Sequence, residues 1–238
     1  MKKTFFSLLL VAIGSVTALM AQQRIWLLGD GTMASPVEEN QNVVGWGDAL
    51  LTRVQAGIEV KNLAAYGMNL NEFAQKGGLD SLIVEKVRKD ILLVQVGQND
   101  LKETNMLQYS SLELFTERLL ALVEAAQAKK MQVVLCTPMA QPYYKDGVLI
   151  DRLGGYAEAV RRVAVSSGVL LVDLEKLSKD WMASLGEDGV AAYYVGLDTT
   201  HTPEGEYLLN EDGAQAVAKM VADVLLATGN KLILKVIK

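Results

Sequence analysis

Residues 24–33 read Arg-Ile-Trp-Leu-Leu-Gly-Asp-Gly-Thr-Met. The apolar run predicts a short strand, and the Gly-Asp-Gly that follows it predicts a tight turn. Four later segments have the same form, because each is brief, rich in leucine or β-branched residues, and bounded by Gly, Asp, Asn or Pro. The five expected strands are residues 24–28, 58–62, 91–97, 132–137 and 169–173.

Longer amphipathic segments alternate with these strands and predict helices. Asn210 is placed to cap the last of them, and Gly229 is placed to stop it. Strands that are apolar throughout favour a parallel sheet covered on both faces, and the repeated strand–helix order then predicts a three-layer α/β fold. The expected helices are residues 46–55, 79–88, 112–130, 156–166 and 210–227.

In such folds, ligands bind beyond the carboxyl ends of the strands, so the loops that follow the strands are the places to look for chemistry. The second strand leads into a loop that runs from Asn62 to Gly67, and the third closes on Gly97-Gln98-Asn99-Asp100. Ahead of the last helix stands Asp198-Thr199-Thr200-His201. Each is ordinary turn chemistry by itself, but their order and placement point to one site.

Together with Gly29-Asp30-Gly31-Thr32, these blocks resemble those of the SGNH (GDSL-type) hydrolase superfamily. Gly45-Trp46-Gly47, and Asp198-Thr199-Thr200-His201-Thr202 ahead of Gly213-Ala214, are similar to its rhamnogalacturonan acetylesterase branch. The resemblance implies a flavodoxin-like fold with a central parallel sheet of about five strands. It also implies removal of acetyl esters from pectic or other plant polysaccharide by a serine nucleophile, with no metal or other cofactor. No His, Cys or Asp cluster in the sequence has metal-ligand spacing.

The resemblance also assigns roles to five residues. His201, the single histidine, would be the general base, and Asp198 would orient it and stabilise its charged form. The backbone N–H groups of Gly31 and Gly67 and the side-chain amide of Asn99 would form the oxyanion hole. Gly31 stands where the family has its catalytic serine, so the donor N–H is kept while the nucleophile is missing.

This departure predicts impaired catalysis, because no acyl-enzyme can form without a hydroxyl at position 31. Thr32 and Ser35 carry hydroxyl groups nearby, but they point away from the nucleophile position on a turn. A serine replaced by glycine to trap substrate would give the same sequence. Three interpretations remain: an esterase scaffold that acts on acetylated glycan, a non-catalytic binder of acetylated glycan or of a protein partner, and a purely structural flavodoxin-like domain.

The N-terminus predicts export. Lys2 and Lys3 precede a short apolar run, and Ala21 offers a cleavage site, so we expect a signal peptide over residues 1–21 and one hydrolase domain over residues 22–238. A membrane anchor is the alternative. A periplasmic or extracellular location follows, with no membrane association after cleavage. The formal net charge of −5 argues against nucleic-acid binding. The tail at residues 231–238 has no predicted role.

Overall fold

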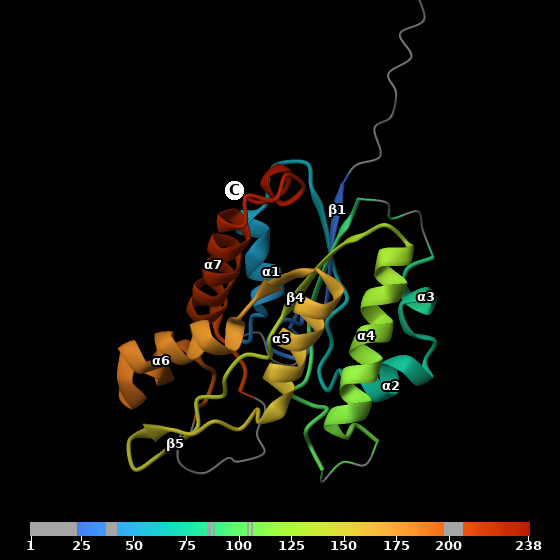
Figure 1. Ribbon diagram of the computed structural model, residues 1–238. Coiled ribbons are helices and arrows are strands. Elements are labelled where there is room, and N and C mark those ends of the chain that lie inside the picture. The colour runs from blue at the N-terminus through green and yellow to red at the C-terminus, as the bar shows by residue number, and fades with distance from the viewer. Residues whose placement is uncertain are drawn as a thin grey trace, which may run out of the picture.

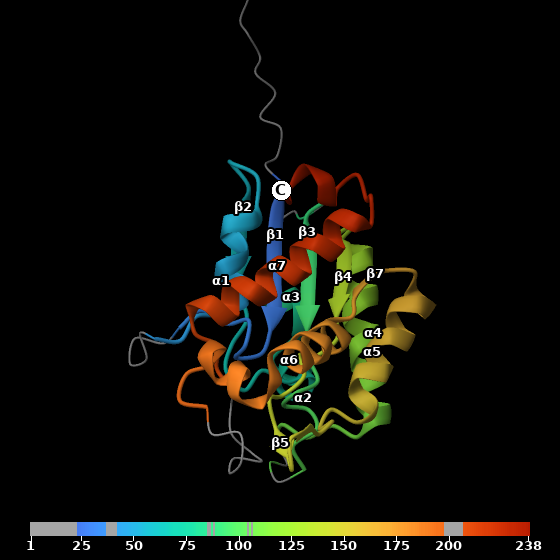
Figure 2. The same ribbon diagram turned by 90° about the vertical axis from the view of Figure 1, so that its left-hand side faces the viewer.

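The computed structural model describes residues 23–36, 42–84, 87, 89–103, 105, 107–197 and 207–238. Five parallel strands form the central sheet in the order β2-β1-β3-β4-β7, which confirms the predicted three-layer α/β fold (Figure 2). All five predicted strands are present within two residues of their expected bounds. They are β1 (Arg24–Gly29), β2 (Glu59–Asn62), β3 (Ile91–Gln95), β4 (Gln132–Cys136) and β7 (Leu170–Val172).

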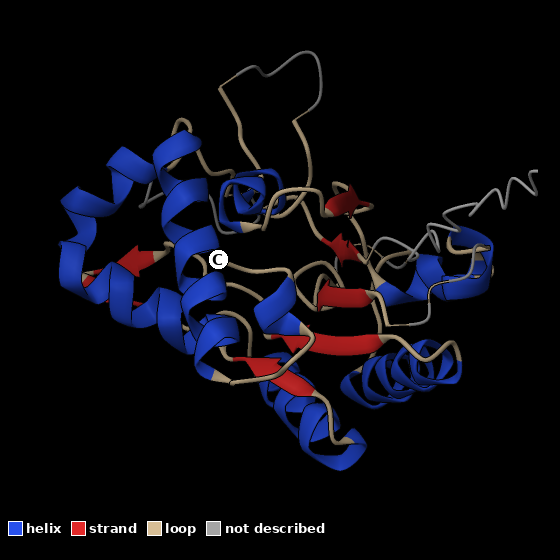
Figure 3. Cartoon of the chain, turned by 90° about the horizontal axis from the view of Figure 1, so that it is seen from above, coloured by secondary structure: helices blue, strands red, loops and turns tan. Residues whose placement is uncertain are grey.

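The sheet is buried on both faces because alternate residues of each strand enter two separate apolar cores. On β1, Ile25 and Leu27 pack with α1 and α7, whereas Trp26 and Leu28 pack with α2 to α5. Figures 1 and 3 show these helices on opposite sides of the sheet. The helices are α1 (Trp46–Ala49), α2 (Leu70–Gln75), α3 (Gly78–Leu82), α4 (Leu112–Ala128), α5 (Gly155–Ser167), α6 (Leu174–Val190) and α7 (Glu211–Ala227), and the short 3₁₀ helices are η1 (Leu50–Arg53), η2 (Ala191–Tyr193) and η3 (Ile233–Lys235).

Two helices, α2 and α6, were absent from the sequence prediction. Helix α2 has only six residues, too few to show a period. Helix α6 is interrupted at Gly186, where a positive φ of 72° breaks the helical geometry. The predicted helix at residues 79–88 is the shorter α3, and the one at residues 46–55 divides into α1 and η1. Asn210 caps α7 as expected, since its side chain accepts the backbone N–H of Gly213 at 3.0 Å.

The strand order brings the loops after β1 and β3 together. Both neighbours of β1 run parallel to it, and Gly29 at its end pairs with Gln95 at the end of β3. Strand β2 lies on one side of β1, and β3 lies on the other. The loops that follow β1 and β3 therefore diverge, and a crevice is expected between them. This position supports the predicted site.

The loop after β4 and the C-terminal tail complete the fold at opposite ends of the sheet. The long loop after β4 carries a hairpin of β5 (Tyr144–Lys145) and β6 (Val148–Leu149), which lies at the carboxyl-end side of the sheet (Figure 1). The tail packs at the opposite end, where Ile237 bridges to Val54 and is 2 % exposed. Its apolar residues thus complete the core beside α7.

Candidate active site

The turn after β1 is fixed by the buried carboxylate of Asp30. Its Oδ1 accepts the backbone N–H of Thr32 at 3.0 Å and the Thr32 hydroxyl at 2.7 Å. From the end of β3, Gln95 Nε2 donates to Asp30 Oδ2 at 2.9 Å and to Thr32 Oγ1 at 2.8 Å. Asp30 therefore organises the turn, as the sequence predicted, and locks it to the neighbouring strand.

The hydrogen bonds of this turn also show how the hydroxyl groups of Thr32 and Ser35 are used. The Thr32 hydroxyl donates inward to Asp30 and accepts from Gln95, so its hydrogen-bonding capacity is used inside the protein. The Ser35 hydroxyl donates to Asp48 Oδ1 at 2.8 Å on the exposed side of the turn. Both hydroxyl groups are therefore engaged in hydrogen bonds of the turn, and neither is free to serve as a nucleophile at the position predicted for one.

The Gly45-Trp46-Gly47 segment packs directly on this turn. A side chain at Gly45 would place its Cβ 2.0 Å from the backbone oxygen of Ala34, so only glycine fits. Trp46 is fully buried. Its backbone N–H donates to the Thr32 carbonyl at 2.9 Å, and its indole N–H donates to Gln95 Oε1 at 2.7 Å. The tryptophan is therefore a structural part of the turn, not a binding surface.

The loop after β2 reaches the same region. Asn62 donates its amide to the Met33 carbonyl at 3.0 Å and to Asp48 at 2.9 Å, which ties the loop to the β1 turn. Gly67 has a φ of +72°, a conformation that side chains rarely adopt. Glycine at this position thus lets the backbone turn sharply next to the β3 loop.

The loop after β3 supplies a second set of polar groups. Asn99 is 3 % exposed and donates Nδ2 to the Met68 carbonyl at 3.0 Å, so one amide hydrogen holds the Gly67 loop and the other stays available. Asp100 is completely buried, and its Oδ1 accepts the backbone N–H of Leu70 at 2.8 Å. Burial raises the pKa of Asp100 to about 7, against the lowering effect of the backbone N–H of Leu70.

A small pocket opens between the loops after β1 and β3. In the described part of the chain, the backbone N–H groups of Gly31 and Gly67 make no hydrogen bond, and the residue Gly31 is buried. Gln98 is 7 % exposed and its buried Oε1 lacks a partner. Buried groups of this kind call for a ligand or water. The pocket is lined by Asp30, Gly31, Thr32, Gln98, Asn99, Tyr207 and Leu208.

The predicted site residues are therefore placed in part. Gly31 and Asn99 line the same pocket, whereas Gly67 lines a second pocket together with Tyr66. Asp198 and His201 lie outside the described residues, so their roles remain predictions.

The sequence prediction missed three residues at the site. Tyr207 and Leu208 line the pocket from the segment before α7, and the ring of Tyr66 packs over Gly31. Tyr66 directly precedes Gly67 in the second block, so its place in the loop was the available signal. Tyr207 lies only six residues after His201, which indicates the same region.

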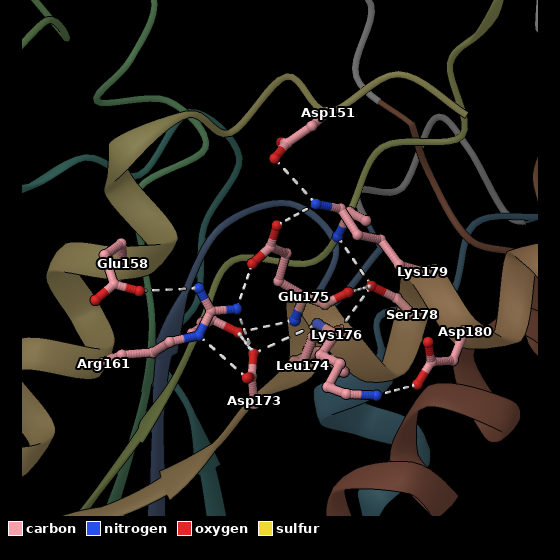
Figure 4. A network of polar contacts seen from close by, with 12 residues as sticks. Asp151, Glu158, Arg161, Asp173, Leu174, Glu175, Lys176, Ser178, Lys179 and Asp180 are labelled. Carbon is pink, nitrogen blue, oxygen red and sulfur yellow. Dashed lines mark hydrogen bonds and ion pairs between the residues drawn. The ribbon is translucent and has the colours of Figure 1, made fainter. Parts of the chain in front are cut away.

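A polar cluster at the β7–α6 junction is fully engaged and supports the fold (Figure 4). Arg161 of α5 forms a bidentate pair with Asp173, with distances of 2.7 and 3.1 Å, and also pairs with the buried Glu175. Although burial opposes it, the hydrogen bond from Arg161 leaves the pKa of Asp173 below its ordinary value. Lys179 of α6 joins Glu175 to Asp151, so α5, α6 and the loop before α5 are held together.

Within the described ranges, no group of three or more His, Cys, Asp or Glu side chains could hold a metal ion. No helix among those residues is long and apolar enough to cross a membrane.

Comparison with known proteins relates the chain to two esterases. The chain is 28 % identical over 219 residues to a probable rhamnogalacturonan acetylesterase, YesY, of Bacillus subtilis (strain 168), which covers 90 % of this chain and 97 % of that protein. It is 26 % identical over 207 residues to the rhamnogalacturonan acetylesterase RhgT of the same organism, covering 84 % and 88 % of the two chains.

The fold agrees with this relationship. The crystal structure of the protein YxiM from Bacillus subtilis matches with a TM-score of 0.75 at 22 % identity, over 88 % of this chain and 58 % of that one. The sequence model of the GDSL-like Lipase/Acylhydrolase family matches residues 27–216, which contain both strand-end loops of the pocket. This chain belongs to the GDSL-like Lipase/Acylhydrolase family.

Proposed function

We propose that this protein is a carbohydrate O-acetylesterase-type protein that recognises acetylated pectic or other plant polysaccharide and hydrolyses it poorly. The observation that carries the proposal is the pocket at the ends of β1 and β3, which is lined by both Gly31, whose N–H is unbonded among the described residues, and Asn99, whose side-chain amide keeps one hydrogen unbonded there. Two such donors suit the carbonyl oxygen of an acetyl ester, on which negative charge develops during hydrolysis. The similarity to two rhamnogalacturonan acetylesterases supports the choice of substrate.

In the proposed reaction, His201 takes a proton from water while Asp198 steadies the imidazolium that forms. The hydroxide attacks the acetyl carbonyl, the oxyanion is held by the donors of Gly31 and Asn99, which line this pocket, and the sugar oxygen leaves with the proton. The products are acetate and a free sugar hydroxyl. No side chain at position 31 offers a covalent route, and loss of the nucleophile in another hydrolase cost on the order of a million-fold in rate.

A second candidate function is binding without catalysis, either of the acetylated glycan or of a protein partner. It is favoured by the Tyr66 ring, which packs against Gly31 where an attacking side chain would stand. Whether the protein is a poor esterase or a binder of acetylated glycan, the bound ester would remain intact for long periods.

Calorimetry and acetate release test these functions together. We expect acetylated rhamnogalacturonan oligosaccharides to bind, the saponified oligosaccharides to bind at least tenfold more weakly, and acetate release to stay near the uncatalysed background. Asn99→Ala should weaken binding, while Asn71→Ala on α2 should not. Absence of binding to every acetylated oligosaccharide would refute the glycan form of the proposal, and rapid acetate release would refute impaired catalysis.

Export and domain organisation are part of the proposal. We infer that residues 1–21 are removed during export to the periplasm or the exterior and that residues 22–238 form one domain. N-terminal sequencing of the protein recovered from expressing cells should give Gln22 as the first residue. An intact N-terminus in the recovered protein would instead support a retained anchor.

A further inference from the structure

The ring of Tyr66 occupies the space into which a side chain at position 31 would project. A Cβ built on Gly31 would lie 2.9 Å from Cδ1 and 3.3 Å from Cε1 of Tyr66. Carbon atoms that are not bonded prefer separations of about 3.5–4.0 Å, so the first contact is repulsive. The next neighbour, Leu208 Cδ2 at 3.6 Å, is at an ordinary contact distance. Tyr66 is therefore the single described neighbour that a serine would displace.

The backbone at Gly31 does not itself require glycine. Its φ lies outside the positive range that disfavours side chains, unlike that of Gly67 in the adjacent loop. Among the residues that the structure describes, the obstacle to a Cβ at position 31 is thus steric and comes from the ring of Tyr66.

The backbone around Tyr66 is anchored on both sides. The Ala65 N–H donates to the Gly29 carbonyl at 3.0 Å, and the Met68 N–H donates back to Ala65 at 3.1 Å. The Met68 carbonyl in turn accepts the Asn99 amide at 3.0 Å. The loop cannot retreat without breaking its bonds to β1 and to the oxyanion donor Asn99, so relief would have to come from rotation of the ring.

The ring has a direction in which it could rotate. Tyr66 also lines a second pocket, which is mainly apolar. That pocket is lined by Leu28, Leu63, Ala65, Tyr66, Gly67, Met68, Asn69, Glu72, Phe73, Lys76, Ser81 and Leu82. Whether the ring stays over Gly31 or turns into this pocket determines whether position 31 can hold a nucleophile.

We propose that the ring of Tyr66 fills the space that a nucleophilic side chain at position 31 would need, so that Gly31 and Tyr66 form one sterically coupled pair. An acetyl ester in the pocket then stays bound without forming an acyl-enzyme. This inference rests on the proposed function only in taking Gly31 as the nucleophile position. It predicts that Gly31→Ser alone restores little esterase chemistry, and that a second substitution at Tyr66 is needed.

Thermal unfolding measures the steric coupling without any assay of activity. Gly31→Ser should lower the melting temperature by about 2–10 °C, as overpacking in a domain of this size does. In a Tyr66→Ala background, Gly31→Ser should lower the melting temperature much less than it does in the native background. In a Tyr66→Phe background the decrease should persist, because phenylalanine keeps the ring. Equal effects of the serine in all three backgrounds would overturn the proposal.

Acylation gives the functional readout. With p-nitrophenyl acetate as the probe, the Gly31→Ser/Tyr66→Ala protein should be acylated at least tenfold faster than Gly31→Ser or Gly31→Ser/Tyr66→Phe. Equal acylation rates in the three proteins would overturn the closing role of Tyr66. If none is acylated but the melting temperatures show the coupling, the steric pair stands, and the assignment of position 31 as the nucleophile site is wrong.

Discussion

Asp100 should make the protein less stable as the pH rises from about 4 to neutrality. Its side chain is completely buried, Oδ1 accepts the Leu70 N–H, and Oδ2 has no hydrogen-bond partner among the residues that the structure describes. Burial raises its pKa from the ordinary value of 3.8 to about 7, even though the Leu70 N–H and the charge of Arg118 lower it. The substitution Asp100→Asn keeps an acceptor for Leu70 and removes the ionisation.

The sign follows from the two protonation states. Below the ordinary pKa of 3.8, the carboxyl is protonated in both the folded and the unfolded chain, so it adds no pH dependence. Between that value and about 7, the folded protein keeps the proton while the unfolded chain loses it, and the free energy of unfolding falls as the pH rises. Each pH unit costs about 1.4 kcal/mol, so the full penalty above neutrality is about 4 kcal/mol.

Paired unfolding curves at pH 5 and pH 8 test this reasoning. The advantage of Asp100→Asn over the native chain should grow by about 2.5 kcal/mol between the two values, or about 5–10 °C in melting temperature. As a control, Asp80→Asn removes an exposed carboxylate on α3 and should leave the pH dependence unchanged. If the curves of the native chain and Asp100→Asn stay parallel from pH 5 to pH 8, the buried carboxyl does not hold its proton near neutrality.

Three further substitutions test the framework around the site. Arg161→Met leaves two carboxylates without their shared cation and should cost about 2–3 kcal/mol in chemical unfolding, whereas Arg162→Met, one position along the same helix and exposed, should change little. Asn210→Ala removes the cap of α7 and should cost about 1 kcal/mol in the same assay. Gly45→Ala would bring its Cβ to 2.0 Å from the Ala34 oxygen, so soluble expression should fall sharply; normal expression and melting would show that the turn can move aside.

The sequence predicted the sheet well because each strand is a short apolar run closed by turn residues. Every predicted strand is present, since burial on both faces of the sheet demands apolar residues throughout. The helices were harder to predict where the pattern was short or broken. Gly186 interrupts α6, and the antiparallel hairpin after β4 depends on Asp146 and Gly147, both with positive φ, which apolar periodicity does not report.

The candidate site could be predicted from the sequence only as a set of loops. Gly31 and Asn99 were expected at one pocket because parallel strands end at the same edge of the sheet, and they do line one pocket. The position of a ring is a different kind of information. Nothing in the sequence of the second loop states that Tyr66 turns toward Gly31, because that contact depends on how two loops pack in three dimensions.

Position 31 illustrates how a missing side chain and its surroundings must be considered together. If glycine had replaced serine in an otherwise unchanged site, an empty space would be expected above its Cα, and a single substitution would refill it. Instead, the ring of Tyr66 takes that space while the Gly31 N–H and the Asn99 amide keep their places beside the pocket. Under the proposed function, the groups that would hold an ester carbonyl are thus retained, and the space for a nucleophile at position 31 is occupied. The proposal of a steric pair therefore makes Tyr66, as much as Gly31, the residue to change.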